Sequence, residues 1–228
     1  MFEQSGTFKN VFKKLGYKAK DYDIANDYNE TDVQCDLFSE IEKGYLGLKS
    51  VFDKVKPTDY ILAFFPCTQF ECQKNMFFRG NACQMQNYTD EEKLASNLFY
   101  HKLLHEYYEL ITKLAILCLR KNLKLVIENP YNQPHYLTSY WSLKPSIVDT
   151  NRRLHGDYYK KPTQYWFINC EPKSNVVNME FQEVKKRIVS PNQWSSKPSI
   201  RERSEIHPQY AEWFIRSYLI EQEDFNLS

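Results

Sequence analysis

Cys67 and Glu128 bring together a nucleophile and an acid at comparable places in the sequence. Cys67 comes two residues after the apolar run YILAFF (60–65), with Pro66 between them, and Glu128 directly follows the run LKLVI (123–127). A continuous apolar run such as YILAFF is typical of a strand buried on both faces. A thiol is a soft nucleophile, and a carboxyl group in a partly dry site can deliver a proton. The spacing therefore predicts that the two side chains open into one shared pocket.

Each of these residues also has a simpler interpretation. Cys67 could be an inert buried thiol, which is a common fate of cysteine in proteins. Glu128, with Asn129 and Pro130 after it, could form a turn at the end of a strand. A glutamate near the middle of a sheet is costly to bury without a task, however, and this favours the chemical interpretation.

Polar or small residues also follow the other expected strands. Ser5-Gly6-Thr7 leads into a helix, where a small turn lets the backbone approach a ligand and the helix N-terminus favours a carboxylate. Asp23 could accept hydrogen bonds from ribose hydroxyls, and Asp36 from an adenine amino group. Taken alone, each aspartate is as well explained by a turn or a cap.

The elements that must position these residues alternate between helices and strands. Helices are expected at 8–15, 41–52, 93–120 and 210–220, and strands at 17–24, 33–37, 60–65, 123–127 and 165–168. Residues 67–89 are polar and aperiodic, and we expect a long functional loop there. This alternation predicts an α/β fold with a doubly wound, mostly parallel sheet, whose carboxyl edge carries the site.

Composition leaves the partner open. The chain has 228 residues, net charge +1 and abundant aromatic residues, which suits one large folded domain. Residues 144–203 hold 12 Lys and Arg against 6 Asp and Glu, a bias compatible either with a phosphate backbone or with an uneven surface. The six scattered cysteines form no CxxC pair, so reduced thiols are expected and no metal site. No apolar run is long enough for a membrane helix, and because MFEQSGTFKN (1–10) lacks an apolar stretch, we expect no secretory signal there.

Taken together, these motifs resemble those of the DNA cytosine carbon-5 methyltransferases. FEQSG (2–6), YDI (22–24) and CDLF (35–38) look like the family's first three motifs. FPCTQF (65–70) looks like its Pro-Cys nucleophile motif and IENP (127–130) like its Glu-Asn motif, and this pair is the most specific part. KKPTQYWF (160–167) lies where the family has a Gln- and Arg-rich strand, and HPQYAEWFIRSYL (207–219) looks like the last motif.

The resemblance implies a Rossmann-like methyltransferase fold, S-adenosylmethionine as cofactor and a flipped cytosine of DNA as substrate. The thiolate of Cys67 would add to carbon 6, and Glu128, with Asn129 beside it, would hold and protonate ring nitrogen 3. Carbon 5 would then take the methyl group, a base would remove its proton and the thiolate would leave. The residues expected to bind the cofactor are Phe2, Ser5, Gly6, Thr7, Asp23, Ile24, Asp36 and Pro66. Those expected to contact the substrate are Gln69, Gln84, Gln86, Pro130, Lys161 and Thr163, and Met85 is a further residue that could fill the space left by the base.

Several features depart from the family pattern. The sequence begins almost inside the first motif, Gln4 replaces a usual Gly, and Phe65 replaces the usual first Pro. The Arg of the Gln-x-Arg-x-Arg strand is not evident, and Lys161, Thr163, Arg152 or Arg153 could substitute for it. Only about 30 residues, 171–197, lie where the family has its large target-recognition domain, so we expect no such domain within these residues. We expect a catalytic and cofactor-binding domain at 1–170, a short insertion at 171–198, and at 199–228 a C-terminal helix that packs back beside the N-terminal segment.

Other functions remain open. Asn129-Pro130-Tyr131 resembles part of the motif of amino-group methyltransferases, which would need no cysteine. The chain could also be an inactive methyltransferase-fold protein that binds DNA or acts as a decoy, and RNA could replace DNA as substrate. A small phage or mobile-element enzyme related to restriction and modification would suit this short chain, acting in the cytoplasm of a bacterium or phage-infected host. The sequence predicts no membrane partner and leaves the oligomeric state unknown.

Overall fold

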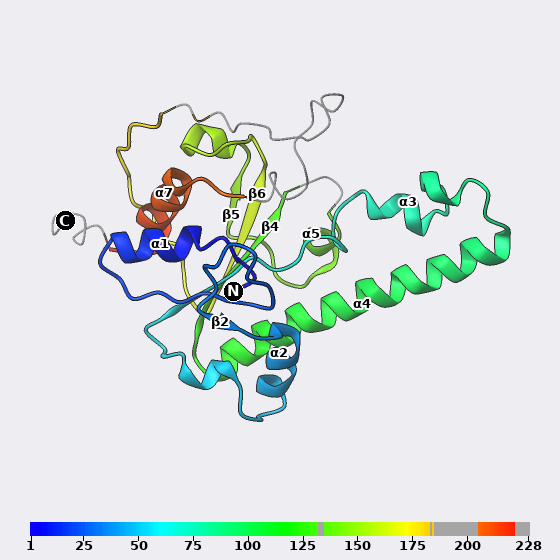
Figure 1. Cartoon of the computed structure of the whole chain (residues 1–228), viewed down its shortest axis with the longest axis horizontal. Helices are drawn as coiled ribbons and strands as arrows, with labels where there is room; N and C mark the ends of the chain where they lie inside the picture. The colour runs from blue at the N-terminus through cyan, green and yellow to red at the C-terminus, as the bar shows by residue number, and fades with distance from the viewer. Residues whose placement is uncertain (132–134, 183, 185–204, 222–228) are drawn as a thin grey trace. The chain divides into compact units, whose positions relative to one another are not determined.

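The computed structural model describes residues 1–131, 135–182, 184 and 205–221 (Figure 1). The chain divides into two compact units. Unit 1 comprises Met1–Cys35, Asp149–Thr163 and Glu171–Ser228, and unit 2 comprises Asp36–Val148 and Gln164–Cys170. Helices and a mostly parallel four-stranded sheet give a mixed α/β structure, as the alternation of elements predicted.

Unit 2 is built around that four-stranded sheet. Its strand order is β3 (Tyr60–Ala63), β4 (Lys124–Pro130), β6 (Thr163–Ile168) and β5 (Ile147–Asp149), so the last strand in sequence lies between two earlier ones. Strands β3 and β4 are parallel, with Ala63 opposite Ile127. These two strands are apolar because they are buried within the unit: in β4, Leu125, Val126 and Ile127 are at most 2% exposed.

Helices of unit 2 supply much of its core. Helix α2 (Leu37–Tyr45) and the 3₁₀ turn η1 (Val51–Lys54) pack with α4 (Asp90–Arg120), burying Ile41, Phe52, Ile111 and Leu114. Thr89 caps α4 with a capping box that it shares with Glu92, as a threonine before early acids predicts. Figure 1 shows the N-terminal half of α4 running away from the sheet beside the short helix α3 (Lys74–Phe78). The 3₁₀ turn η2 (Cys83–Met85) and helix α5 (Tyr136–Tyr140) complete the unit.

Unit 1 gathers segments from both ends of the chain. Helix α1 (Thr7–Lys14) packs against α7 (Pro208–Tyr218), with the rings of Phe8 and Phe214 6.0 Å apart (Figure 1). The predicted contact of the C-terminal helix with the N-terminal segment is thereby confirmed. Strands β1 (Tyr22–Asp23) and β2 (Val33–Gln34) form a small parallel pair, and the 3₁₀ turn η3 (Arg152–His155) packs on α7.

Several predicted elements are shorter than expected. The strand expected at 17–24 is regular only at Tyr22–Asp23, because lysines 18 and 20 interrupt its apolar run. The helix expected at 41–52 begins earlier, at Leu37, and ends at Tyr45, where Gly47 at φ 77 turns the chain into η1. The loop expected at 67–89 contains α3 and η2, and α5, β5 and η3 were not predicted. Within the described residues, no helix has the length and apolar content that crossing a membrane would require.

Candidate active site at the ends of two neighbouring strands

Parallel pairing of β3 and β4 brings the Pro-Cys and Glu-Asn segments to one edge of the sheet. Ala63 lies opposite Ile127, so Cys67 comes four residues, and Glu128 one residue, beyond a matched pair of positions. Glu128 does not follow the strand, as the sequence suggested, because β4 continues through Pro130. Both Cys67 and Glu128 are partly exposed, and Asn129 and Pro130 are buried.

Asn129 links the two segments directly. Its side-chain amide donates hydrogen bonds to the carbonyl oxygens of Phe65, at 2.9 Å, and of Glu128, at 2.7 Å. The side chain is 0% exposed, so both bonds form away from water, where losing one is most costly. Asn129 therefore fixes the backbone two residues before Cys67 against the strand that carries Glu128.

The thiol of Cys67 has a carboxylate partner that the sequence analysis missed. Cys67 Sγ lies 3.2 Å from Oε1 of Glu71 and donates to it, and Phe70 N donates to the Cys67 carbonyl oxygen in the tight turn between them. A neighbouring carboxylate can take the thiol proton when the sulfur attacks. The spacing of four residues within FPCTQFE was the available signal.

Aromatic rings pack around the turn that carries Cys67. The rings of Phe65 and Phe70 are 6.4 Å apart, and both contact Tyr107 of α4 edge to face. Phe65 and Phe70 are at most 1% exposed. The Phe that stands at position 65 in place of a second Pro is thus a core residue that anchors the segment leading to Cys67.

A buried polar network extends from the end of β4 to β6. Gln164 Nε2 donates to the Pro130 carbonyl oxygen at 2.8 Å, and Thr138 Oγ1 donates to Gln164 Oε1 at 2.8 Å. These bonds fix the amide orientation of Gln164, and His135 Nδ1 lies 3.4 Å from Gln164 Nε2 and 3.3 Å from Thr138 Oγ1. Burial lowers the pKa of His135 to about 4, which keeps the ring neutral.

Three polar atoms in this region have no hydrogen-bond partner among the described residues: Gln69 Oε1, Asn129 Oδ1 and His135 Nε2. Each belongs to a side chain that is at most 9% exposed. Unpaired buried polar atoms are rare because each costs about 1–3 kcal/mol. Bound water or a polar ligand could satisfy these three atoms.

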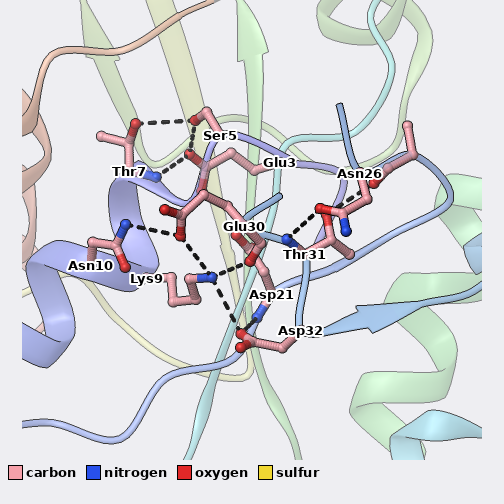
Figure 2. A network of polar contacts seen from close by, with 11 residues as sticks. Glu3, Ser5, Thr7, Lys9, Asn10, Asp21, Asn26, Glu30, Thr31 and Asp32 are labelled. Carbon is pink, nitrogen blue, oxygen red and sulfur yellow. Dashed lines mark hydrogen bonds and ion pairs between the residues drawn. The ribbon is translucent and has the colours of Figure 1, made fainter. Parts of the chain in front are cut away.

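In unit 1, the turn expected to meet the cofactor already contains a carboxylate (Figure 2). Glu3 Oε1 accepts hydrogen bonds from Thr7 N, at 2.8 Å, and from Ser5 Oγ, at 2.5 Å. Burial is the main cause of a raised pKa at Glu3, and these bonds oppose it. Gly6 has φ 69, a left-handed conformation that favours glycine, and a Cβ there would lie 3.0 Å from the Cβ of Glu30. The chain itself therefore supplies the anion that was predicted to come from a ligand.

Next to this turn lies a group of acids around one lysine (Figure 2). Lys9 is 6% exposed and pairs with Glu30, at 3.1 Å, and with Asp32, at 3.5 Å. Asp32 also accepts from the backbone N–H of Asp21. Burial, followed by the nearby charge of Glu3, raises the pKa of Asp21 to about 7.

The remaining residues predicted to bind the cofactor are more open. Asp23 accepts from the backbone of Ala25, and Asp36 caps α2 by accepting from Phe38 N, so each has the local role that was the simpler interpretation. Asp36 is exposed, Asp23 is partly exposed and Ile24 is 64% exposed, which leaves room for a ligand. Phe2, in the left-handed region at φ 58, and Pro66 are partly exposed.

The predicted substrate residues fall into two groups. Gln84 and Gln86 are exposed and Lys161 is partly exposed, whereas Thr163, Gln69 and Pro130 are buried. Met85 is 1% exposed, so it packs inside rather than being presented to a substrate.

Arg152 is not available as a phosphate ligand in this arrangement. It is 0% exposed, pairs with Asp157 at 2.5 Å and lies over the ring of Tyr210. The hydroxyl of Thr163 accepts from Arg152 and donates to the Lys161 carbonyl oxygen. Of the residues considered as replacements for the missing arginine, only Lys161 and Arg153 reach solvent.

Comparison with known proteins identifies no relative: no protein-family model, no curated protein and no solved structure matches the chain. Among the described residues, no group of three His, Cys, Asp or Glu side chains is arranged to hold a metal ion.

Proposed function

We propose that the chain transfers a methyl group from S-adenosylmethionine to carbon 5 of a cytosine in DNA, by way of a covalent adduct with Cys67. One observation carries this proposal. Neighbouring parallel strands deliver a Pro-Cys and a Glu-Asn segment to the same edge of a sheet, and the Asn129 amide ties the two together. The sequence resemblance to the carbon-5 family singles out the same two segments.

Each of these residues has a step that suits its position. The sulfur of Cys67 forms a bond to carbon 6 of the cytosine while Glu71 accepts the thiol proton. Glu128 holds ring nitrogen 3 and protonates it, which places electron density on carbon 5. Asn129 acts as a positioning residue, because its amide is engaged with backbone carbonyl oxygens and its side chain is wholly buried. Carbon 5 then takes the methyl group and a base removes its proton. The electron pair of that C–H bond restores the ring double bond, the sulfur leaves as a thiolate, and nitrogen 3 returns its proton to Glu128.

The cofactor supplies an electrophilic methyl group, and the residues expected to hold it fit this role unequally. Asp23 and Asp36 retain exposed surface for ribose and adenine contacts. The N-terminus of α1 fits less well, because Glu3 already accepts from Ser5 and Thr7 where a ligand carboxylate was expected. We therefore assign α1 no cofactor contact.

The amino-group methyltransferase alternative gains no support from the arrangement of Asn129. Its amide hydrogens are both directed at backbone carbonyl oxygens, and the side chain is 0% exposed. That mechanism needs an asparagine whose side chain is free to bind the target amino group. It also gives the Cys67–Glu71 contact no role in the reaction.

The decisive experiment traps the covalent intermediate. The protein is incubated with S-adenosylmethionine and a random-sequence pool of duplex DNA containing 5-fluorocytosine, whose fluorine cannot be eliminated after methyl transfer. Peptide mass spectrometry should find the nucleotide on Cys67. Cys67→Ser should abolish the adduct, and Cys72→Ser, five residues away, should retain it.

Two negative results together would contradict the carbon-5 proposal: no adduct forms on Cys67, and unmodified DNA gains no 5-methylcytosine. Calorimetric titration then separates the remaining possibilities. Cofactor binding with methylation of an amino group would favour the amino-group enzyme, and DNA binding without cofactor binding would favour a non-catalytic protein.

A further inference from the structure

Aromatic rings from α3, α4 and α5 contact one another in unit 2 (Figure 1). The ring centroid of Phe78 lies 4.7 Å from that of His101 and 5.3 Å from that of Tyr136. Tyr140 stacks on Tyr136, with the centroids 6.2 Å apart and the planes at 28°. A further pair joins α3 to α4, at 4.6 Å. We call the surface formed by these six rings the α3–α5 surface: Phe77, Phe78, Tyr100, His101, Tyr136 and Tyr140.

Every ring of the α3–α5 surface keeps some contact with solvent. Tyr140 is 74% exposed, and His101 is also exposed. The other four rings are partly exposed. Nucleic-acid bases stack on accessible aromatic rings with little regard to sequence, because every base has a flat π-face.

A lysine lies against two of these rings. Lys74 Nζ is 5.0 Å from the centroid of Phe77 and 4.9 Å from that of Tyr100. Burial lowers the pKa of Lys74, and the charge of Glu71 opposes this shift. The carboxylate of Glu71 already accepts from the thiol of Cys67, so it forms no ion pair with this lysine.

Two more cations border the surface near α5. Arg79 is exposed and lies close enough to Tyr136 to affect it: burial raises the pKa of Tyr136, and the charge of Arg79 opposes this. Lys144 is exposed, and its Nζ donates to the carbonyl oxygen of Thr138 in α5 at 3.4 Å. Each of these cations can therefore be reached by an anion from solvent.

The two segments that carry these cations contain no acid. Residues 72–89 and 131–148 include no Asp and no Glu, and their charged residues are Lys74, Arg79 and Lys144. In the part of the chain that the structure describes, no carboxylate pairs with any of the three. The α3–α5 surface thus combines open rings with positive charge that the chain itself does not neutralise.

We propose that the α3–α5 surface binds single-stranded DNA, with unpaired bases stacked on its rings and phosphates beside its cations. A base can reach a ring only when it is not stacked inside a duplex, so the strand must be unpaired there. An acidic peptide would satisfy the cations but would leave the rings without partners. The surface adjoins the turn that carries Cys67, because Tyr136 N donates to the Phe70 carbonyl oxygen at 2.9 Å. The choice of DNA rests on the proposed function, whereas the binding of an unpaired strand does not.

Fluorescence anisotropy of a labelled single strand of about 12 nucleotides measures this binding. The full chain carries Cys67→Ser and no cofactor is added, so no adduct contributes to the signal. The single strand should bind about tenfold more tightly than the duplex of the same sequence. The logarithm of the affinity should fall with the logarithm of the salt concentration with a slope of about −2, because three phosphate contacts contribute about −0.7 each.

Two variants separate stacking from charge. Tyr140→Ala should weaken binding by about tenfold and leave the salt slope unchanged, and Tyr140→Phe should restore the affinity. Arg79→Gln should make the slope shallower by about 0.7. Tyr45→Ala and Arg120→Gln are the matched controls and should change nothing. They alter the same residue types at a ring–cation pair, 4.8 Å apart, that lies outside the α3–α5 surface.

The proposal is overturned if the single strand does not bind, if the duplex binds as tightly, or if Tyr140→Ala binds like the parent. Tighter binding of an RNA strand of the same sequence would overturn the choice of DNA. The adduct assay on Cys67 reports separately on methyl transfer. An adduct without single-strand binding would refute only the role of the α3–α5 surface, and single-strand binding without an adduct would refute only the carbon-5 reaction.

Discussion

The side-chain amide of Asn129 donates a 2.9 Å hydrogen bond to the carbonyl oxygen of Phe65, so the strand that carries Glu128 also holds the segment that carries Cys67. Two residues that are 64 positions apart in sequence thereby set the placement of the proposed nucleophile.

Asn129→Ala should therefore reduce both stability and chemistry. Removing a wholly buried donor should lower the free energy of unfolding by about 1–3 kcal/mol, measured by urea denaturation. Adduct formation at Cys67 should fall even at temperatures where the variant is fully folded. Asn87→Ala, at an exposed position after η2, should change neither quantity; equal losses in both variants would argue against a positioning role for Asn129.

Replacing the carboxylate beside the thiol should slow the first chemical step. Glu71→Gln keeps the size of the side chain but removes the group that accepts the proton of Cys67. We expect the rate of adduct formation to fall by about a hundredfold, the lower range for loss of a general base. Glu106→Gln, on the surface of α4, serves as the control, and an unchanged rate in Glu71→Gln would remove Glu71 from the mechanism.

Breaking the buried ion pair between Arg152 and Asp157 should lower the stability of unit 1 strongly. Asp157→Ala leaves the guanidinium of Arg152 buried without its 2.5 Å partner and should cost about 3–5 kcal/mol of stability. Arg153→Ala, at the exposed neighbouring position, should change stability by less than about 0.5 kcal/mol. Thermal unfolding compares the two, and a mild effect of Asp157→Ala would mean that Arg152 finds another partner or reaches water.

Asp21 should make unit 1 less stable as pH rises. Burial raises its pKa from 3.8 to about 7, so between these values the folded state binds the proton and the unfolded state does not. The free energy of unfolding should therefore fall from about pH 4 to pH 7, and the loss should be a few kcal/mol, on the order of 1.4 kcal/mol per unit of pKa shift.

Asp21→Asn should flatten this profile and raise stability at pH 8. Urea unfolding at each pH from 4 to 8 measures the slope. Asp27→Asn, on the exposed part of the same segment, is the control. A variant profile as steep as that of the parent would assign the pH dependence to another group, with Glu3 the first to examine because its pKa is also raised by burial.

Sequence periodicity predicted the elements that are buried on a regular pattern. The runs at 60–65 and 123–127 became β3 and β4, and the capped segment after Thr89 became α4. These succeeded because apolar side chains and a capping box act locally. Helix α5 and strand β5 were missed because they are five and three residues long, too short to show a period.

Side-chain partners were harder to predict than strands. The sequence singled out Cys67 and Glu128, but Glu71 emerged only when the turn after Cys67 brought the two groups together. Arg152 was considered as a substitute for the family's missing arginine, yet it lies in the core, because Asp157 and Tyr210 compensate its charge there. Such pairings depend on how distant segments fold onto one another, which residue type and spacing do not encode.

The carboxylate of Glu3 gives α1 a counter-ion that never leaves the chain. A ligand anion could bind at this helix end only by displacing the Glu3 carboxylate. Because Glu3 belongs to the same chain, its effective concentration there is much higher than that of a free metabolite. Sulfate or phosphate should therefore not bind at the N-terminus of α1 in the native protein. An anion-binding site would form at this helix end only when the Glu3 carboxylate is removed. In Glu3→Ala the backbone N–H of Thr7 would be free to donate to an anion from solvent.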